Sequence, residues 1–284
     1  LQDVVRIMVM NMELAAPAPS SNWLALLRDH ARNHPFAALG LGVATLATLA
    51  LLVQSVVWVL TGEEAINPRY ALLGGTAGFV ATALGALPAL VLRGIPQRLE
   101  DSLLGMAAGM MLAASAFSLL LPGLDAGTEL LGNKPLGAGV VVFGMALGVL
   151  LMLGLDEFTP HEHDKTGPCG PGYERCGRIW LFVFAIALHN LPEGMAIGVS
   201  FSQGDLTVGL PLTTAIALQD IPEGLAVALA LRGAGFSLST AILVAAGSGL
   251  LEPLGALLGV GLSSGLAVAY PIGLGLAAGA MIFV

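Results

Sequence analysis

Long apolar segments, separated by short polar ones, make up most of this chain. A helix needs about 20 apolar residues to cross the hydrocarbon core of a bilayer. Eight segments qualify: 36–60, 70–92, 102–124, 136–155, 179–202, 206–231, 236–262 and 265–284. The pattern therefore predicts an all-α polytopic membrane protein with eight transmembrane helices visible in this chain. Residues 1–35 are mixed in character and are predicted to form an N-terminal tail.

Composition agrees with a membrane protein. Of the 284 residues, 56% are hydrophobic and only 11% are charged, whereas a soluble domain has about 25% charged residues. The formal net charge of −8 argues against binding to nucleic acid. The two cysteines, Cys169 and Cys176, are too few for a disulfide scaffold.

Lysine and arginine are distributed unevenly between the two sides of this arrangement. Nine of them fall on the side of the N-terminal tail, and Arg69 and Lys134 fall on the other side. Because basic loops are retained in the cytoplasm, tail 1–35 and loop 156–178 are predicted to be cytoplasmic. The expected location is the inner, or plasma, membrane of the cell.

A short polar pattern occurs twice within the apolar segments. Residues 187–194 read Ala-Leu-His-Asn-Leu-Pro-Glu-Gly, and residues 217–224 read Ala-Leu-Gln-Asp-Ile-Pro-Glu-Gly. Charged and metal-binding side chains are costly in mid-membrane, so they indicate function there. Spacings of three and four residues place them on one face of a helix. Two such faces meeting in a bundle would suit a divalent metal ion.

Four carboxylic acids lie within the predicted spans without a lysine or arginine nearby: Glu193, Asp220, Glu223 and Glu252. They cannot all remain ionised in a medium of low dielectric constant, and a bound cation would resolve that conflict. Imidazole together with carboxylate favours zinc-like ions over magnesium or calcium.

A proline lies next to three of these carboxylates. Pro192, Pro222 and Pro253 each lack the N–H that a helix uses, so each helix is expected to bend beside a glutamate. Bent or broken helices at mid-membrane are common in transporters.

The sequence His-Asn-x-Pro-Glu-Gly followed by Gln-Asp-x-Pro-Glu-Gly resembles the signature of the ZIP (Zrt/Irt-like) metal transporters, especially their bacterial GufA-like branch. The resemblance covers residues 70–284 and implies that segment 36–60 is one extra helix before the ZIP core. It implies seven of the eight core helices, arranged as an inverted-repeat bundle, because the family's last helix would follow Val284. The core therefore looks truncated at its C-terminus.

The resemblance also implies the function and its residues. This would be transport, without enzyme activity, of Zn²⁺ and related ions such as Cd²⁺ toward the cytoplasm by an elevator-type motion. Two adjacent metal sites would share Glu193 and Glu223. The implied ligands are Met111, His189, Asn190, Glu193, Gln219, Asp220, Glu223 and Glu252. An exit site in the cytoplasmic loop would use Asp156, His161 and His163, although a solvated polar loop is the alternative reading.

Two other classes of protein would also bury such residues. A proton-coupled carrier without metal needs membrane carboxylates, but His189 and Met111 argue against it. An intramembrane metalloprotease needs the spacing His-Glu-x-x-His, which His161-Glu162-His163 lacks. The expected partners are divalent metal ions, the lipid bilayer and a second copy in a homodimer, with no nucleic acid.

Overall fold

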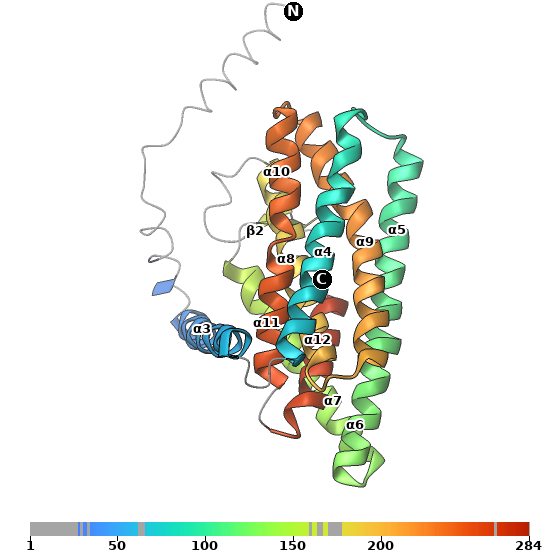
Figure 1. Cartoon of the computed structure of the whole chain (residues 1–284). Helices are drawn as coiled ribbons and strands as arrows, with labels where there is room; N and C mark the ends of the chain where they lie inside the picture. The colour runs from blue at the N-terminus through green and yellow to red at the C-terminus, as the bar shows by residue number, and fades with distance from the viewer. Residues whose placement is uncertain are drawn as a thin grey trace, which may run out of the picture.

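The computed structural model describes residues 28, 31–32, 35–61, 66–158, 161–163, 167–169, 178–263 and 266–283. These residues are almost entirely helical and form a bundle (Figure 1). The helices are α3 (Pro35–Thr61), α4 (Ile66–Ala86), α5 (Gln97–Ala113), α6 (Leu121–Leu131), α7 (Lys134–Phe158), α8 (Arg178–Phe201), α9 (Leu206–Gly233), α10 (Leu238–Ser248), α11 (Leu251–Ser263) and α12 (Ala269–Phe283). The all-α prediction is therefore confirmed for the described residues, apart from one small hairpin.

Six helical spans in the described residues are long and apolar enough to cross a membrane, and α12 is a shorter apolar helix. The polytopic membrane character is thus confirmed, whereas the count of eight transmembrane helices stays a prediction. The span 102–124 was predicted too short. A π-helical segment, η2 (Ala114–Leu120), joins α5 to α6, so the helical span runs over 31 residues, Asp101–Leu131.

The span predicted at 236–262 is divided into α10 and α11 at Gly249 and Leu250. Pro253 has no N–H to give to the carbonyl of Gly249, and that carbonyl accepts instead from the N–H of Glu252, at 3.1 Å. The chain therefore turns more tightly just before Glu252. By contrast, α8 and α9 continue as helices through Pro192 and Pro222.

Glycines bring several pairs of helices into backbone contact. A Cβ atom on Gly194 or Gly198 of α8 would overlap the carbonyl oxygens of Glu252 or Ala256 in α11. The same holds for Gly144 of α7, which faces the carbonyl of Ile272 in α12. Small residues thus allow close helix packing, as they do in other membrane helices. The pair Gly105 and Gly109 differs, because neither has an atom near the position of a Cβ.

Two groups of helices result. Helices α4, α8, α9 and α11 pack on one another, while α12 packs against α7, which also contacts α6. The main buried core lies where α8, α9, α11 and α12 meet η2; it includes Ile197, Ile216 and Leu274.

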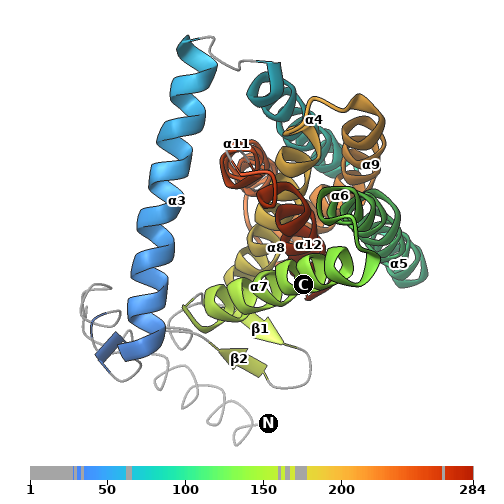
Figure 2. The same ribbon diagram turned by 90° about the horizontal axis from the view of Figure 1, so that it is seen from below.

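Helix α3 confirms a helix at 36–60. It lies across the bundle, seen end-on in Figure 1 and along its length in Figure 2. It contacts α11, and Leu52 packs against a cluster that contains Met195 and Leu258. Its role as an extra transmembrane helix stays a prediction, and the tail 1–35 lies almost wholly outside the described residues.

Short connections define two further features. Helix α9 begins after Asp205, whose carboxylate accepts a hydrogen bond from the N–H of Thr207 at 2.8 Å. Hydrogen bonds from Thr207 lower the pKa of Asp205, so this cap is charged at neutral pH. Only Ser202 to Asp205 separate α8 from α9, as expected for antiparallel neighbours.

In the loop after α7, β1 (His161–His163) pairs antiparallel with β2 (Gly167–Cys169), a hairpin that the sequence did not predict.

Candidate metal site

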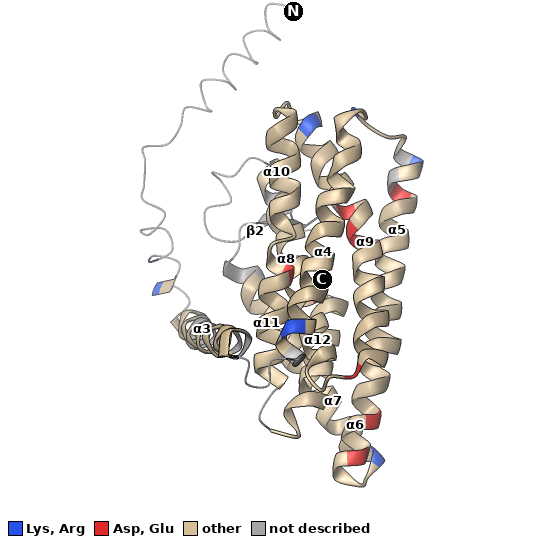
Figure 3. Cartoon of the chain, in the orientation of Figure 1, with Lys and Arg blue, Asp and Glu red and all other residues tan. Residues whose placement is uncertain are grey.

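The two copies of the polar pattern meet inside the bundle. Helix α8 carries the first copy and α9 carries the second, and Figure 3 shows acidic residues part-way along both helices. Glu193, Asp220 and Glu223 each offer a carboxylate oxygen, and these three oxygens lie within 4.8 Å of one another. All three residues are buried. The structure therefore brings together three of the residues that the spacing argument singled out.

Hydrogen bonds satisfy only part of this cluster. The side-chain amide of Gln219 donates to Oε1 of Glu193. Several buried polar atoms of the expected ligands have no hydrogen-bond partner: Asn190 Nδ2, Glu193 Oε2, Gln219 Oε1, Asp220 Oδ1, Asp220 Oδ2 and Glu252 Oε2. Buried polar groups are normally paired, and leaving one unpaired is costly. Five of these six atoms are oxygens that can accept a cation, so the donor set fits a divalent metal ion.

Glu252 joins the cluster from α11 with the help of α4. Its side chain is 0% exposed. Oε1 accepts a hydrogen bond from the hydroxyl of Thr82, at 3.1 Å. A Cβ atom on Gly78 would overlap Oε2 of Glu252 and lie 3.1 Å from Oδ2 of Asp220. Thr82 and Gly78 were not among the predicted site residues, because neither has a charged or metal-binding side chain.

His189 and Met111 are placed less centrally. Nδ1 of His189 lies 2.7 Å from the carbonyl oxygen of Ala185, which assigns the ring proton to Nδ1 and the lone pair of the neutral ring to Nε2. His189 does not belong to the cluster of three carboxylates. Met111 is half-buried in the last turn of α5, directly before the π-helical segment η2. Such segments are rare and often mark functional sites.

The predicted exit site is only partly visible. Asp156 lies in the last turn of α7, and His161 and His163 are two residues apart in β1. The side chains of these three residues lie outside the described part of the structure.

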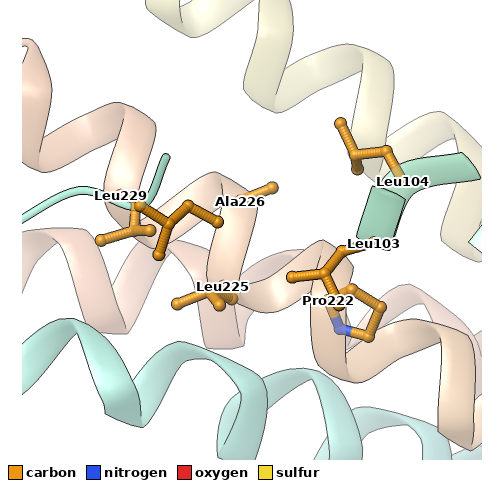
Figure 4. A pocket seen from close by; sticks show the side chains of 7 residues that line it. Leu103, Leu104, Pro222, Leu225, Ala226 and Leu229 are labelled. Atoms are coloured by element: carbon orange, nitrogen blue, oxygen red, sulfur yellow. The ribbon is translucent and has the colours of Figure 1, made fainter. Parts of the chain in front are cut away.

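A small apolar crevice lies between α5 and α9, close to Pro222. It is lined by Ile95, Leu103, Leu104, Pro222, Leu225, Ala226 and Leu229 (Figure 4). Pro222 directly precedes Glu223, so the crevice lies on the helix that carries two of the three residues of the cluster.

Comparison with known proteins identifies the family of the chain. The family model described as ZIP zinc transporter matches residues 161–284. Zinc transporter ZIPB of Bordetella bronchiseptica is 64% identical over 254 residues, which cover 89% of this chain and 82% of that protein. Zinc transporter GufA of Myxococcus xanthus is 40% identical over 213 residues, covering 75% and 82%. Zinc transporter ZIP11 of Homo sapiens is 30% identical over 298 residues, covering 75% and 86%. The chain thus belongs to the ZIP family of zinc transporters, in its GufA-like branch.

Proposed function

We propose that this protein moves Zn²⁺, and related divalent ions such as Cd²⁺, across the cell membrane toward the cytoplasm. The observation that carries the proposal is the buried cluster of Glu193, Asp220 and Glu223, whose oxygens converge, three of them without a hydrogen-bond partner. Relatives named zinc transporters support the choice of metal. As a member of a transporter family, the protein is not an enzyme.

The metal is the transported substrate, and we assign its ligands as two adjacent sites. Glu193 and Glu223 would serve both ions. Met111, His189 and Gln219 would complete the first site, and Asn190, Asp220 and Glu252 would complete the second. The oxygen atoms without hydrogen-bond partners in Asp220, Gln219 and Glu252 support this assignment. For His189, the contact of Nδ1 with Ala185 supports Nε2 as the ligand atom.

An elevator-type motion would suit the two groups of helices. Helices α4, α8, α9 and α11 contain every expected ligand except Met111, so they would carry the metal. They would slide against α5, α6, α7 and α12. Residues 70–284 would form the ZIP core, with α8 and α9 as the centre of an inverted repeat. Its eight-helix count and a homodimer belong to the same proposal.

Transport itself distinguishes the candidate classes. We expect proteoliposomes that contain the purified chain to accumulate radioactive zinc, whereas protein-free liposomes should not. A proton carrier without metal would instead change the internal pH in the absence of zinc. A metalloprotease would cleave a peptide reporter and accumulate nothing. Zinc flux with neither of these activities is the result that the buried cluster predicts.

We propose that the protein lies in the inner membrane of the cell, with its N-terminus and loop 156–178 in the cytoplasm. Labelling of cysteine tests this orientation. Cys169 and Cys176 lie in that loop. They should resist a membrane-impermeant maleimide on spheroplasts and react after the membrane is opened. A cysteine introduced at Asn133, in the exposed turn between α6 and α7, is the matched control and should react from outside. Labelling of the native cysteines from outside would reverse the orientation.

We also propose a metal-binding site in the cytoplasmic loop 156–178. Asp156, His161 and His163 would receive the ion as it leaves the membrane site. The pairing of His161 with Cys169 across the hairpin brings a second metal-binding residue type to the same loop. A metal titration of a variant with both histidines replaced by alanine should lose a weak site and keep the membrane sites.

A further inference from the structure

We infer that Thr82 of α4 is a positioning residue for metal binding, which holds the carboxylate of Glu252 in the second site. This inference rests on the proposed function, because Glu252 is a ligand only there. Thr82 is 2% exposed, and its hydroxyl donates a hydrogen bond to the carboxylate of Glu252. It reaches Oε1 at 3.1 Å from a different helix, 170 residues away in the chain.

The two oxygens of Glu252 therefore have different surroundings. Oε1 lies against Thr82 and within 3.2 Å of the position that a Cβ atom on Gly249 would take. Oε2 has no hydrogen-bond partner and lies against Gly78, near Oδ2 of Asp220. Because Thr82 occupies one oxygen, the other oxygen points at the cluster. Glu252 is thus arranged to offer Oε2 to a metal ion.

Helix α4 also holds the backbone of this ligand. A Cβ atom on Gly75 would meet the carbonyl oxygen of Glu252, and so would a Cβ atom on Gly194 of α8. Gly75, Gly78 and Thr82 are three and four residues apart, so they lie on one face of α4. This face closes around Glu252, and α11 begins just before it.

The hydroxyl of Thr82 has a second acceptor, the carbonyl oxygen of Gly78 at 3.2 Å. A hydroxyl has one proton, so the two acceptors compete for it. Hydrogen bonds to an ionised carboxylate are the stronger kind. Thr82 should therefore donate to Glu252 when that carboxylate is charged, as it must be when it binds a metal ion.

The test is calorimetric titration of the full chain in detergent with Cd²⁺. The unchanged chain should bind two equivalents tightly, in the membrane sites. Thr82→Val keeps the shape of the side chain and removes the donor, so it should weaken the second equivalent by about 10- to 100-fold and leave the first in place. Thr82→Ser keeps the hydroxyl and should bind both. Thr76→Val is the matched control, because Thr76 lies exposed on α4 and donates only to the carbonyl of Leu72, at 2.6 Å.

A second comparison separates positioning from general packing. If Thr82 acts through Glu252, Thr82→Val should change the remaining affinity by less than about a factor of two once Glu252 is already alanine. A further loss in that background would overturn the inference, as would a Thr82→Ser variant as weak as Thr82→Val. Unweakened binding of both equivalents by Thr82→Val would overturn it too. An unchanged chain that binds no Cd²⁺ would contradict the proposed function instead.

Gly78→Ala decides the matter if Thr82→Val does not yield monodisperse protein. The added methyl group would overlap Oε2 of Glu252. It should therefore displace that oxygen and remove the second equivalent while the first remains. Retention of both equivalents would mean that Glu252 does not bind metal from this position.

Discussion

Replacing Glu193 with alanine should abolish both tight metal binding and zinc uptake. Glu193 is completely buried at the centre of the site, where it accepts a hydrogen bond from Gln219 and lies beside Asp220 and Glu223. Because it would serve both ions, its loss removes a ligand from each. We expect affinity to fall by more than the roughly 10- to 100-fold that removal of a supporting partner costs. Radioactive zinc uptake into proteoliposomes should fall to the level of protein-free liposomes.

Two further variants make this result specific. Glu193→Gln retains the size of the side chain and removes its charge, so it should be as inactive as Glu193→Ala. Glu129→Ala removes an exposed carboxylate from α6 and should leave uptake unchanged. Calorimetry that showed two unchanged equivalents in Glu193→Ala would contradict the assignment of this residue as a shared ligand.

Replacing Gly198 with leucine should prevent α8 from packing against α11. The position of a Cβ atom at Gly198 is already occupied by the carbonyl oxygen of Ala256, and backbone cannot move aside as a side chain can. We expect a loss of stability at or beyond the upper end of the roughly 1–3 kcal/mol that overpacking usually costs. Because α8 and α11 carry Glu193 and Glu252, metal binding should be lost with the fold. Thermal unfolding followed by size-exclusion chromatography measures this.

Gly105→Leu is the matched control for that experiment. It makes the same change at a glycine of α5, but no atom lies within 4 Å of a Cβ at Gly105. Its melting temperature should therefore stay close to that of the unchanged chain. Equal damage from both variants would show that the added side chain acts through helix insertion and not through the contact with α11.

The duplicated motif made the centre of the site predictable. Local spacing fixes which side chains share a helix face, and the short turn after Phe201 requires α8 and α9 to be neighbours. Those two facts suffice to bring Glu193 and Glu223 together. Glu252 could be proposed because a carboxylate within an apolar span is uncommon. In each case the chemistry of the residue itself was the signal.

The parts contributed by α4 could not be predicted in the same way. Gly78 and Thr82 are ordinary residues of a membrane helix, and their role depends on how closely α4 approaches α11. That approach is set by packing across the whole bundle, which local patterns do not encode. The β1–β2 hairpin and the crosswise α3 were missed for the same reason. The break between α10 and α11 was easier to predict from the sequence, because Pro253 lacks the N–H that a regular helix would need there.

The π-helical segment η2 changes how the long span that begins at Asp101 must be interpreted. Each of its turns contains more residues than a turn of α-helix, so the faces of α6 are rotated relative to those of α5. One helical wheel drawn through residues 102–124 would therefore assign the wrong neighbours to one half of the span. Alignments of relatives should be checked here for the gain or loss of a single residue. Such a change would rotate one half of the span about the helix axis relative to the other half, while leaving the composition of the span almost unaltered.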